Sequence, residues 1–122
     1  YVARREQDKL EAIILASGSE LELALKAAER LGSGIRVVSM PSFFRFDAQP
    51  AEYRESVLPP SCMKRVSVEA GVTGLWWKYV GCQGEAVGIN RFGFSAPGNQ
   101  VLDELGMNVD NVVNAVQNVL AR

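Results

Sequence analysis

The sequence predicts an α/β fold in which a mainly parallel sheet lies between helices on both faces, a three-layer α/β/α arrangement. Short runs of aliphatic and β-branched residues alternate along the chain with segments whose apolar residues recur at helical spacing. Such alternation is typical of a parallel sheet that is covered by helices. In addition, the run Ala12–Ala16 is apolar throughout, as expected for a strand that is buried on both faces.

The first third of the chain is expected to form two strands and a helix. Tyr1–Glu6 is polar enough for an edge strand, residues 7–9 would turn the chain back, and Ala12–Ala16 would be a buried strand. We expect a helix to begin at Ser19, because Ser19 and Glu22 have the spacing of a capping box. Its apolar stripe would consist of Leu21, Ala24, Leu25, Ala28 and Leu31.

The middle of the chain combines a strand with an aromatic segment. Ile35–Ser39 is a β-branched run that predicts a buried strand, and Pro41 ends it because proline lacks the N–H of a ladder bond. Phenylalanine follows at positions 43, 44 and 46. We interpret this stretch as a loop that either covers a core or marks an interface. Asp47 and the segment Ala51–Val57 are expected to form short helical turns.

The last half predicts two more strands and three helical segments. The strands are Arg65–Glu69 and Glu85–Ile89, and a short helix over residues 75–80 lies between them. Pro97 suits the first turn of a further helix. The final helix would be capped near Asn108 or Asp110, with a buried stripe of Val109, Val112, Val113, Val116, Val119 and Leu120.

Length and composition place the chain among ordinary globular domains. With 122 residues, 48% hydrophobic residues and 22% charged residues, it is expected to fold as one domain. The net charge is −1 without a block of like charges. This argues against nucleic-acid and anionic-membrane partners, which need a basic patch. No apolar run approaches the roughly 18 residues that span a bilayer.

Cysteine and histidine usage narrows the chemistry further. Cys62 and Cys82 stand alone, without the spacing of a zinc site or a disulfide framework. Free thiols favour a reducing compartment such as the cytoplasm. The chain has no histidine, which excludes Ser-His-Asp and Cys-His catalysis within it.

The carboxyl ends of the predicted parallel strands are the expected place for a ligand. At one of them, Ser17, Gly18 and Ser19 lead into a helix, whose free N–H groups could bind an anion such as phosphate. The alternative is that Ser19 only caps its helix and that Glu20 or Glu22 lies at the positive end of the helix. There is no GxGxxG or Walker A pattern.

Several other residues are candidates for an interface. Glu69 and Arg91 are predicted to share the same sheet edge, where an ion pair is favoured over proton transfer because an arginine lowers the pKa of a carboxylate. Arg36 and Arg65 lie too far back along their strands to join them. The candidate interface residues are Phe43, Phe44, Trp76, Trp77, Glu69 and Arg91. For the tryptophans the alternative is one core residue and one half-covered residue.

A family resemblance rests on motifs in a fixed order. The run Met40-Pro41-Ser42 is followed by Phe46-Asp47-Ala48-Gln49 and by Tyr53-Arg54-Glu55-Ser56-Val57-Leu58-Pro59. Further motifs are Val66-Ser67-Val68-Glu69-Ala70-Gly71, Trp77-Lys78-Tyr79-Val80-Gly81, Gly88-Ile89-Asn90-Arg91-Phe92-Gly93 and Ser95-Ala96-Pro97-Gly98. From about residue 11 to the end, the chain resembles the C-terminal domain of a transketolase. The motifs do not separate transketolase from close relatives such as dihydroxyacetone synthase.

The resemblance implies a five-stranded mixed sheet whose first strand is antiparallel to the others. It also implies a full-length homodimeric enzyme that transfers a two-carbon ketol unit from a ketose phosphate to an aldose phosphate. That enzyme would use thiamine diphosphate and Mg²⁺ or Ca²⁺, held mainly by two preceding domains that are not in this chain. Because the chain carries none of their motifs, we assign it no catalytic, cofactor-binding or metal-binding residue.

The predicted role of this domain is therefore to pack against other domains of the same chain, to support the dimer or to bind a regulator. The chain begins at Tyr1 without an initiator methionine, so it is either processed or a piece of a longer protein, and the resemblance favours the second. The alternative hypothesis is a free-standing α/β module that binds an anion or a nucleotide at the Ser17–Glu20 turn.

Overall fold

The computed structural model describes residues 1–69, 76–81, 84–88 and 108–122. In this part of the chain, five strands form one sheet with the order β1-β3-β2-β4-β5. The strands are β1 (Val2–Arg4), β2 (Ala12–Ala16), β3 (Ile35–Ser39), β4 (Arg65–Glu69) and β5 (Glu85–Gly88). β1 pairs antiparallel with β3, and the remaining pairs are parallel. The predicted mixed sheet with an antiparallel first strand is confirmed.

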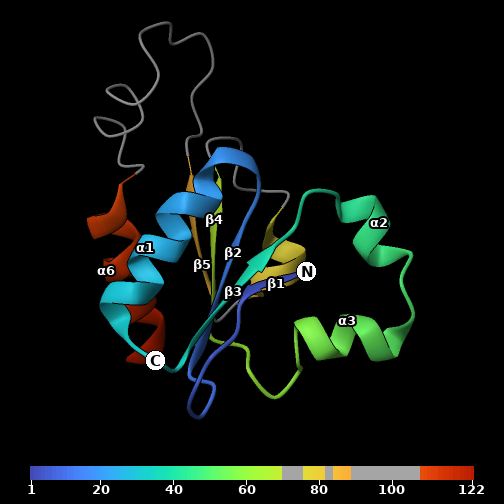
Figure 1. Cartoon of the computed structure of the whole chain (residues 1–122), viewed down its shortest axis with the longest axis horizontal. Coiled ribbons are helices and arrows are strands. Elements are labelled where there is room, and N and C mark those ends of the chain that lie inside the picture. Colours follow the sequence, from blue (N-terminus) through green and yellow to red (C-terminus); the bar gives the residue numbers. More distant parts are fainter. Residues whose placement is uncertain (70–75, 82–83, 89–107) are drawn as a thin grey trace, which may run out of the picture.

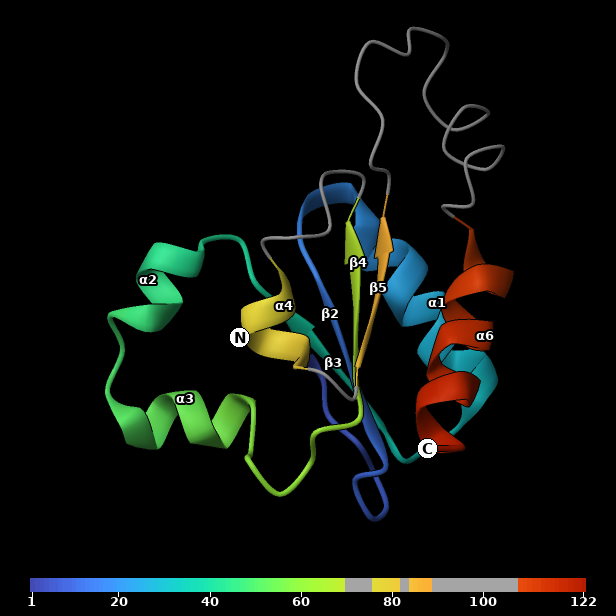
Figure 2. The same ribbon diagram turned by 180° about the vertical axis from the view of Figure 1, so that it is seen from behind.

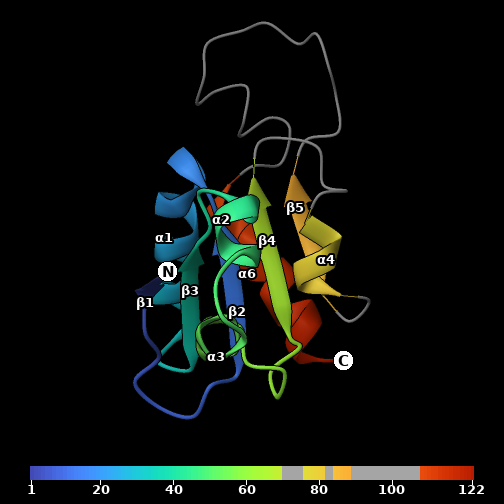
Figure 3. The same ribbon diagram turned by 90° about the vertical axis from the view of Figure 1, so that its right-hand side faces the viewer.

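Helices cover both faces of this sheet, as predicted (Figure 1). α1 (Leu21–Leu31) and α6 (Val109–Leu120) lie side by side on one face. α4 (Trp77–Val80) lies on the other face, and α2 (Phe43–Asp47) and α3 (Ala51–Val57) project from that side (Figure 2). Figure 3 shows α2 and α3 in front of the strands, with α1 and α6 behind them.

The central strand explains why two cores form. All five residues of Ala12–Ala16 are buried, and their side chains alternate between the two faces. Ile14 packs into the core beneath α1 and α6, whereas Ile13 and Leu15 pack into the core on the opposite face. Burial of apolar surface is the main favourable contribution to folding, so these two cores hold the sheet and its helices together.

The start of α1 differs from the prediction. Ser17 is followed by a 3₁₀ turn, η1 (Gly18–Glu20), and α1 begins only at Leu21 with Glu20 at its N-cap position and no side-chain capping bond. Gly18 adopts a left-handed φ of 59°, which glycine tolerates without steric cost and which tightens the chain into the turn. The predicted helix start at Ser19 is therefore wrong, whereas the predicted capping box lies outside the described residues because the Ser19 side chain is not described. Glu22 pairs with Lys26 at 3.1 Å.

The aromatic segment also differs from the expected loop. Phe43–Asp47 is a short helix, because the Ser42 side chain caps it by accepting a hydrogen bond from the Arg45 backbone N–H at 3.2 Å. The predicted helical turn at Ala51–Val57 is confirmed as α3. At the end of the chain, Asn108 caps α6 as predicted, since its side chain accepts a hydrogen bond from the Asn111 N–H at 2.8 Å.

Some predictions fall outside the described residues. These are the helix at Pro97, the position of Arg91, the thiol of Cys82 and the last residue of the strand predicted as Glu85–Ile89. Within the described residues, no helix has the length and apolar character needed to cross a bilayer.

Candidate functional site

The carboxyl edge of the sheet between β2 and β4 is where a ligand site is expected in an open α/β sheet. α1 carries the chain from β2 to β3 on one side of β2, whereas β4 pairs on the other side. Strand order reverses here, and ligands of open α/β sheets bind at such a point. Ser17 follows β2 directly and Glu69 is the last residue of β4, so the two residues meet at this edge.

The Glu69 carboxylate is already bound within the domain. The Ser17 hydroxyl donates to its Oε1 at 3.2 Å, and the Trp76 indole N–H donates to its Oε2. Trp76 is 1% exposed, so its indole is held in place by the core around it. Both carboxylate oxygens therefore have a donor, and the group joins β2, β4 and the segment before α4.

The same contacts bear on the anion site predicted at Ser17, Gly18 and Ser19. The Ser17 hydroxyl is directed to Glu69, and the carboxylate of Glu20, a residue that is 8% exposed, lies near Gly18. Two carboxylates thus flank the turn, and like charges disfavour a further anion. Anion binding at this turn stays a prediction with little support from its surroundings.

The predicted partner of Glu69, Arg91, lies outside the described residues. The two arginines that the sequence placed further back lie near the start of their strands, as expected. Their roles were not predicted. Arg36 forms a two-pronged ion pair with Glu6, in which Nε and Nη2 each donate at 2.8 Å. This hydrogen bond lowers the pKa of Glu6.

Arg65 is 6% exposed and binds backbone carbonyls in place of a carboxylate. Its guanidinium donates to the carbonyl oxygens of Cys62, Leu58, Pro59 and Tyr79 at 2.8–3.2 Å. Burial lowers the pKa of this guanidinium, yet arginine remains charged because its ordinary pKa exceeds 12. A single arginine among apolar residues in a strand is the sequence signal for such a buried cross-link.

The interface residues predicted in the aromatic segment have different environments. We call residues 42–58, which contain α2 and α3, the α2–α3 arm. Phe43 packs against Trp76 with ring centroids 4.9 Å apart and stacks on Tyr79 at 5.1 Å. Phe44, in contrast, is 84% exposed. Trp76 is a core residue, as one alternative held, and the side chain of Trp77 is not described.

α2 is joined to α4 by a polar contact as well. Asp47 accepts hydrogen bonds from the Tyr79 hydroxyl at 3.0 Å and from the Lys78 ammonium at 2.7 Å. The hydrogen bond from Lys78 lowers the pKa of Asp47. Burial, aided by the bond to Asp47, raises the pKa of Tyr79 to about 12. The arm is therefore fixed to the domain at its α2 end.

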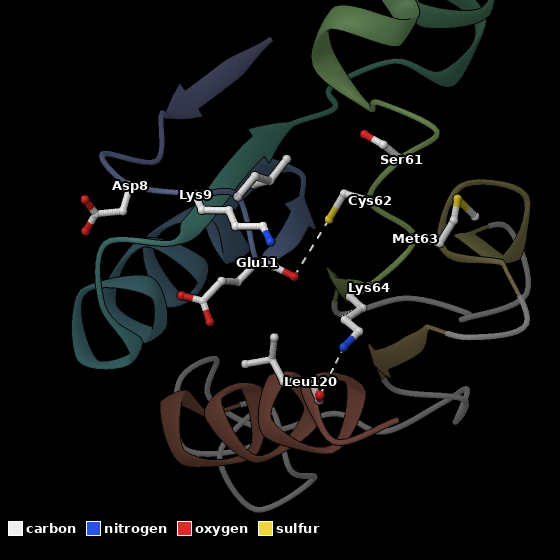
Figure 4. Close-up of a pocket in the computed structure, with 9 residues that line it drawn as sticks. Asp8, Lys9, Glu11, Ser61, Cys62, Met63, Lys64 and Leu120 are labelled. Carbon is white, nitrogen blue, oxygen red and sulfur yellow. Dashed lines mark hydrogen bonds between the residues drawn. The ribbon is translucent and has the colours of Figure 1, made fainter.

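A groove of about 740 Å³ lies at the opposite, amino edge of the sheet (Figure 4). It runs between residues 8–11, residues 61–64 and the end of α6. The Lys64 ammonium donates to the Leu120 carbonyl at 3.1 Å, and the Cys62 thiol points toward the Glu11 carbonyl at 3.8 Å. The lining carries both acidic and basic side chains, so the groove favours neither an anionic nor a cationic ligand.

The described residues do not fit a divalent-metal centre of the kind that a bound diphosphate would require. Among them, no group of three or more Asp, Glu, Cys or His side chains could hold a metal ion. The chain as a whole lacks histidine. In the described ranges, every buried side-chain nitrogen or oxygen has a hydrogen-bond partner, so none of these atoms needs a ligand to complete its hydrogen bonding.

Comparison with known proteins gives a consistent result. The family model for the transketolase-like TK C-terminal domain matches residues 1–108. The transketolase of Physarum polycephalum is 59% identical over 115 residues, and that of Dictyostelium discoideum is 51% identical over 114 residues. These matches cover 94% and 93% of this chain but 17% of each relative.

Solved structures agree with the sequence relatives. The transketolase of Leishmania mexicana matches all of this chain with a TM-score of 0.89 and 42% identity, over 18% of its own length. A split-gene transketolase, described as an inactive β4 tetramer, matches 93% of this chain with a TM-score of 0.67 and 26% identity. The chain thus spans about a fifth of the length of the curated relatives that it matches.

Proposed function

Because the chain belongs to the transketolase family and corresponds to the C-terminal domain of its members, we propose that it supports catalysis without carrying catalytic groups. The complete protein would transfer a two-carbon ketol unit from a ketose phosphate to an aldose phosphate. Thiamine diphosphate and a divalent metal would be held by other domains of the same protein. The homodimer, which the resemblance implies, and the cytoplasmic location, which the cysteine usage of the sequence favours, stay predictions.

The observation that carries this proposal is the state of the carboxylate at the carboxyl edge. A general acid or base must reach the proton it moves, whereas both oxygens of Glu69 are engaged by Ser17 and Trp76. The group is thereby suited to fixing β2 and β4 to each other. The lack of histidine and of a metal-holding cluster among the described residues supports the same interpretation.

The arrangement of the domain is suited to a supporting role. Two buried arginines, Arg36 and Arg65, join the strands to the end of α3 through charge-assisted hydrogen bonds. Such bonds are stronger than neutral ones, so they hold the end of α3 against the strands. A domain of fixed shape can align its neighbours without touching the substrate.

The alternative of a free-standing anion- or nucleotide-binding module has less support. It places the ligand at the Ser17–Glu20 turn, where the carboxylates of Glu20 and Glu69 already lie. Titration of the chain with inorganic phosphate and with nucleotides tests this alternative directly, and tight, specific binding would favour it.

An activity assay tests the proposal itself. The chain alone and the full-length protein are compared at equal molarity with thiamine diphosphate, Mg²⁺ and a ketose phosphate–aldose phosphate pair. We expect ketol transfer by the full-length protein and none by the chain alone. Ketol transfer by the chain alone would show that the catalytic groups lie within these 122 residues.

A further inference from the structure

The α2–α3 arm lacks the packing that normally holds a short helix on a protein. Residues 47–56 are all exposed, and within α3 only Val57 is buried. A helix of seven residues is too short to be stable by itself in water, where about 12–15 residues are needed. An ordinary surface helix buries one apolar face, and α3 has no such face against the described domain.

The domain nevertheless fixes the arm at both ends. At the end of α3, Arg36 donates to the carbonyl oxygens of Ser56 and Val57 at 2.9 and 3.0 Å. Arg65 donates to those of the next two residues at 3.2 and 3.0 Å. Four consecutive carbonyls are therefore held by two buried guanidinium groups. At the other end, Phe43 stacks on Tyr79.

A projection fixed in this way presents its outer side chains in one arrangement. Phe44 is 84% exposed and Tyr53 is 40% exposed. Tyr53 also lines a hollow of about 320 Å³, together with residues that include Met40, Pro41 and Phe46. Aromatic side chains next to an apolar hollow are typical anchors of a protein interface, and pre-organisation lowers the entropic cost of docking.

The position of the first residue indicates what covers the arm. Tyr1 lines the same hollow, and its backbone nitrogen donates to the Ser39 carbonyl at 2.8 Å. This bond needs only one N–H, so the peptide nitrogen of a longer chain would make it equally well. The curated relatives are more than five times as long as this chain. Polypeptide that precedes Tyr1 would therefore leave beside the arm, at a high effective concentration.

We propose that the α2–α3 arm is the docking element for the polypeptide that precedes Tyr1 in the full-length protein, with Phe44 and Tyr53 as its anchors. The inference rests on the proposed function, because it requires that this domain is part of a longer transketolase. The partner of this surface would belong to the same polypeptide chain. A second copy of the protein would be a different partner.

Photo-crosslinking in the full-length protein tests this partner. The variant Phe44→p-benzoylphenylalanine is prepared with light and with heavy isotopes, the two are mixed and allowed to exchange subunits, and crosslinked peptides are identified by mass. We expect crosslinks from position 44 to residues upstream of Tyr1 that join light to light or heavy to heavy, without mixed light–heavy pairs. The same probe at Glu29, which is exposed on α1 across the sheet, measures background capture.

Two outcomes would overturn the proposal: light–heavy crosslinks at the share that subunit exchange gives for contacts between chains, or capture no greater than at Glu29. Hydrogen exchange gives an independent reading, because a helix without packing exchanges rapidly. In the full-length protein we expect α3 amides to be protected and Phe44→Ser to remove that protection, whereas Glu29→Ser leaves it unchanged. Unchanged protection in Phe44→Ser would also overturn the proposal. Ketol transfer by the unmodified protein is measured separately, so a failure of the proposed function is recognised independently.

Discussion

Replacement of Arg65 by methionine should destabilise the domain strongly. The guanidinium donates four hydrogen bonds to the carbonyl oxygens of Cys62, Leu58, Pro59 and Tyr79. Methionine has a similar length but no donor. The substitution therefore leaves carbonyls at the end of α3 and at the end of α4 without their charged partner, while it preserves much of the apolar packing.

The magnitude is a balance of two effects. A hydrogen bond to a charged group contributes about 1.5–3 kcal/mol, and four of them are not additive because they share one side chain. Removal of the guanidinium also removes the several kcal/mol that burial of a charge costs. We expect a net loss of about 3 kcal/mol in the free energy of unfolding, because each buried carbonyl left without a donor costs about 1–3 kcal/mol and relief of the charge burial offsets part of that cost.

Urea unfolding of this chain, followed by circular dichroism, measures that loss. Arg65→Lys keeps the charge but has only three donors on a compact ammonium group. It should therefore lose about half as much free energy of unfolding as Arg65→Met. Arg5→Met, at an exposed position, is the matched control and should change the free energy by less than about 0.5 kcal/mol. If Arg65→Met loses less than about 1 kcal/mol relative to that control, the carbonyl contacts do not hold α3 as argued.

Three other substitutions test separate contacts. Gly84→Ala should cost about 3 kcal/mol in urea unfolding, since a Cβ at Gly84 would lie well inside van der Waals contact with the Arg65 carbonyl oxygen. Glu6→Gln should flatten the acid side of the stability profile: the pKa of Glu6 is lowered from 4.5 by Arg36. The ion pair therefore stabilises the fold above pH 4.5 and is lost as the pH falls through the lower folded value. In a titration that follows phenolate absorbance, one tyrosine should ionise near pH 12. That step should be missing in Tyr79→Phe.

Each of these expectations has a clear contrary result. A fully stable Gly84→Ala variant would mean that the backbone around residue 84 can move aside. Glu6→Gln with the acid unfolding profile of the unsubstituted chain would show that the ion pair with Arg36 adds no pH-dependent stability. Because the raised pKa of Tyr79 favours its neutral form in the folded state, stability should fall between pH 10 and 12. A Tyr79→Phe variant with the same alkaline loss would contradict that assignment.

The strands were predictable because their signal is local. Ala12–Ala16 and Arg65–Glu69 are strands with the bounds that their apolar or β-branched runs indicated. The cap of α6 at Asn108 was one of two predicted positions. In these segments, residue type and spacing indicate which residues form a strand or a helix and which side chains are buried.

Features that depend on contacts between distant residues were not predicted. The start of α1 was misplaced because a left-handed Gly18 produces a 3₁₀ turn that a capping pattern does not reveal. Arg65 appears in the sequence only as a charge in a strand, since its carbonyl partners come from two other segments. The meeting of Ser17 with Glu69, 52 positions apart in sequence, likewise follows only from the strand order.

Binding of thiamine diphosphate tests the central claim of this account most directly. Calorimetric titration in the presence of Mg²⁺ is carried out on the chain of 122 residues and on the full-length protein under the same conditions. We expect binding to the full-length protein and no detectable heat with the chain alone. Saturable, Mg²⁺-dependent binding of the cofactor to the chain alone would contradict it.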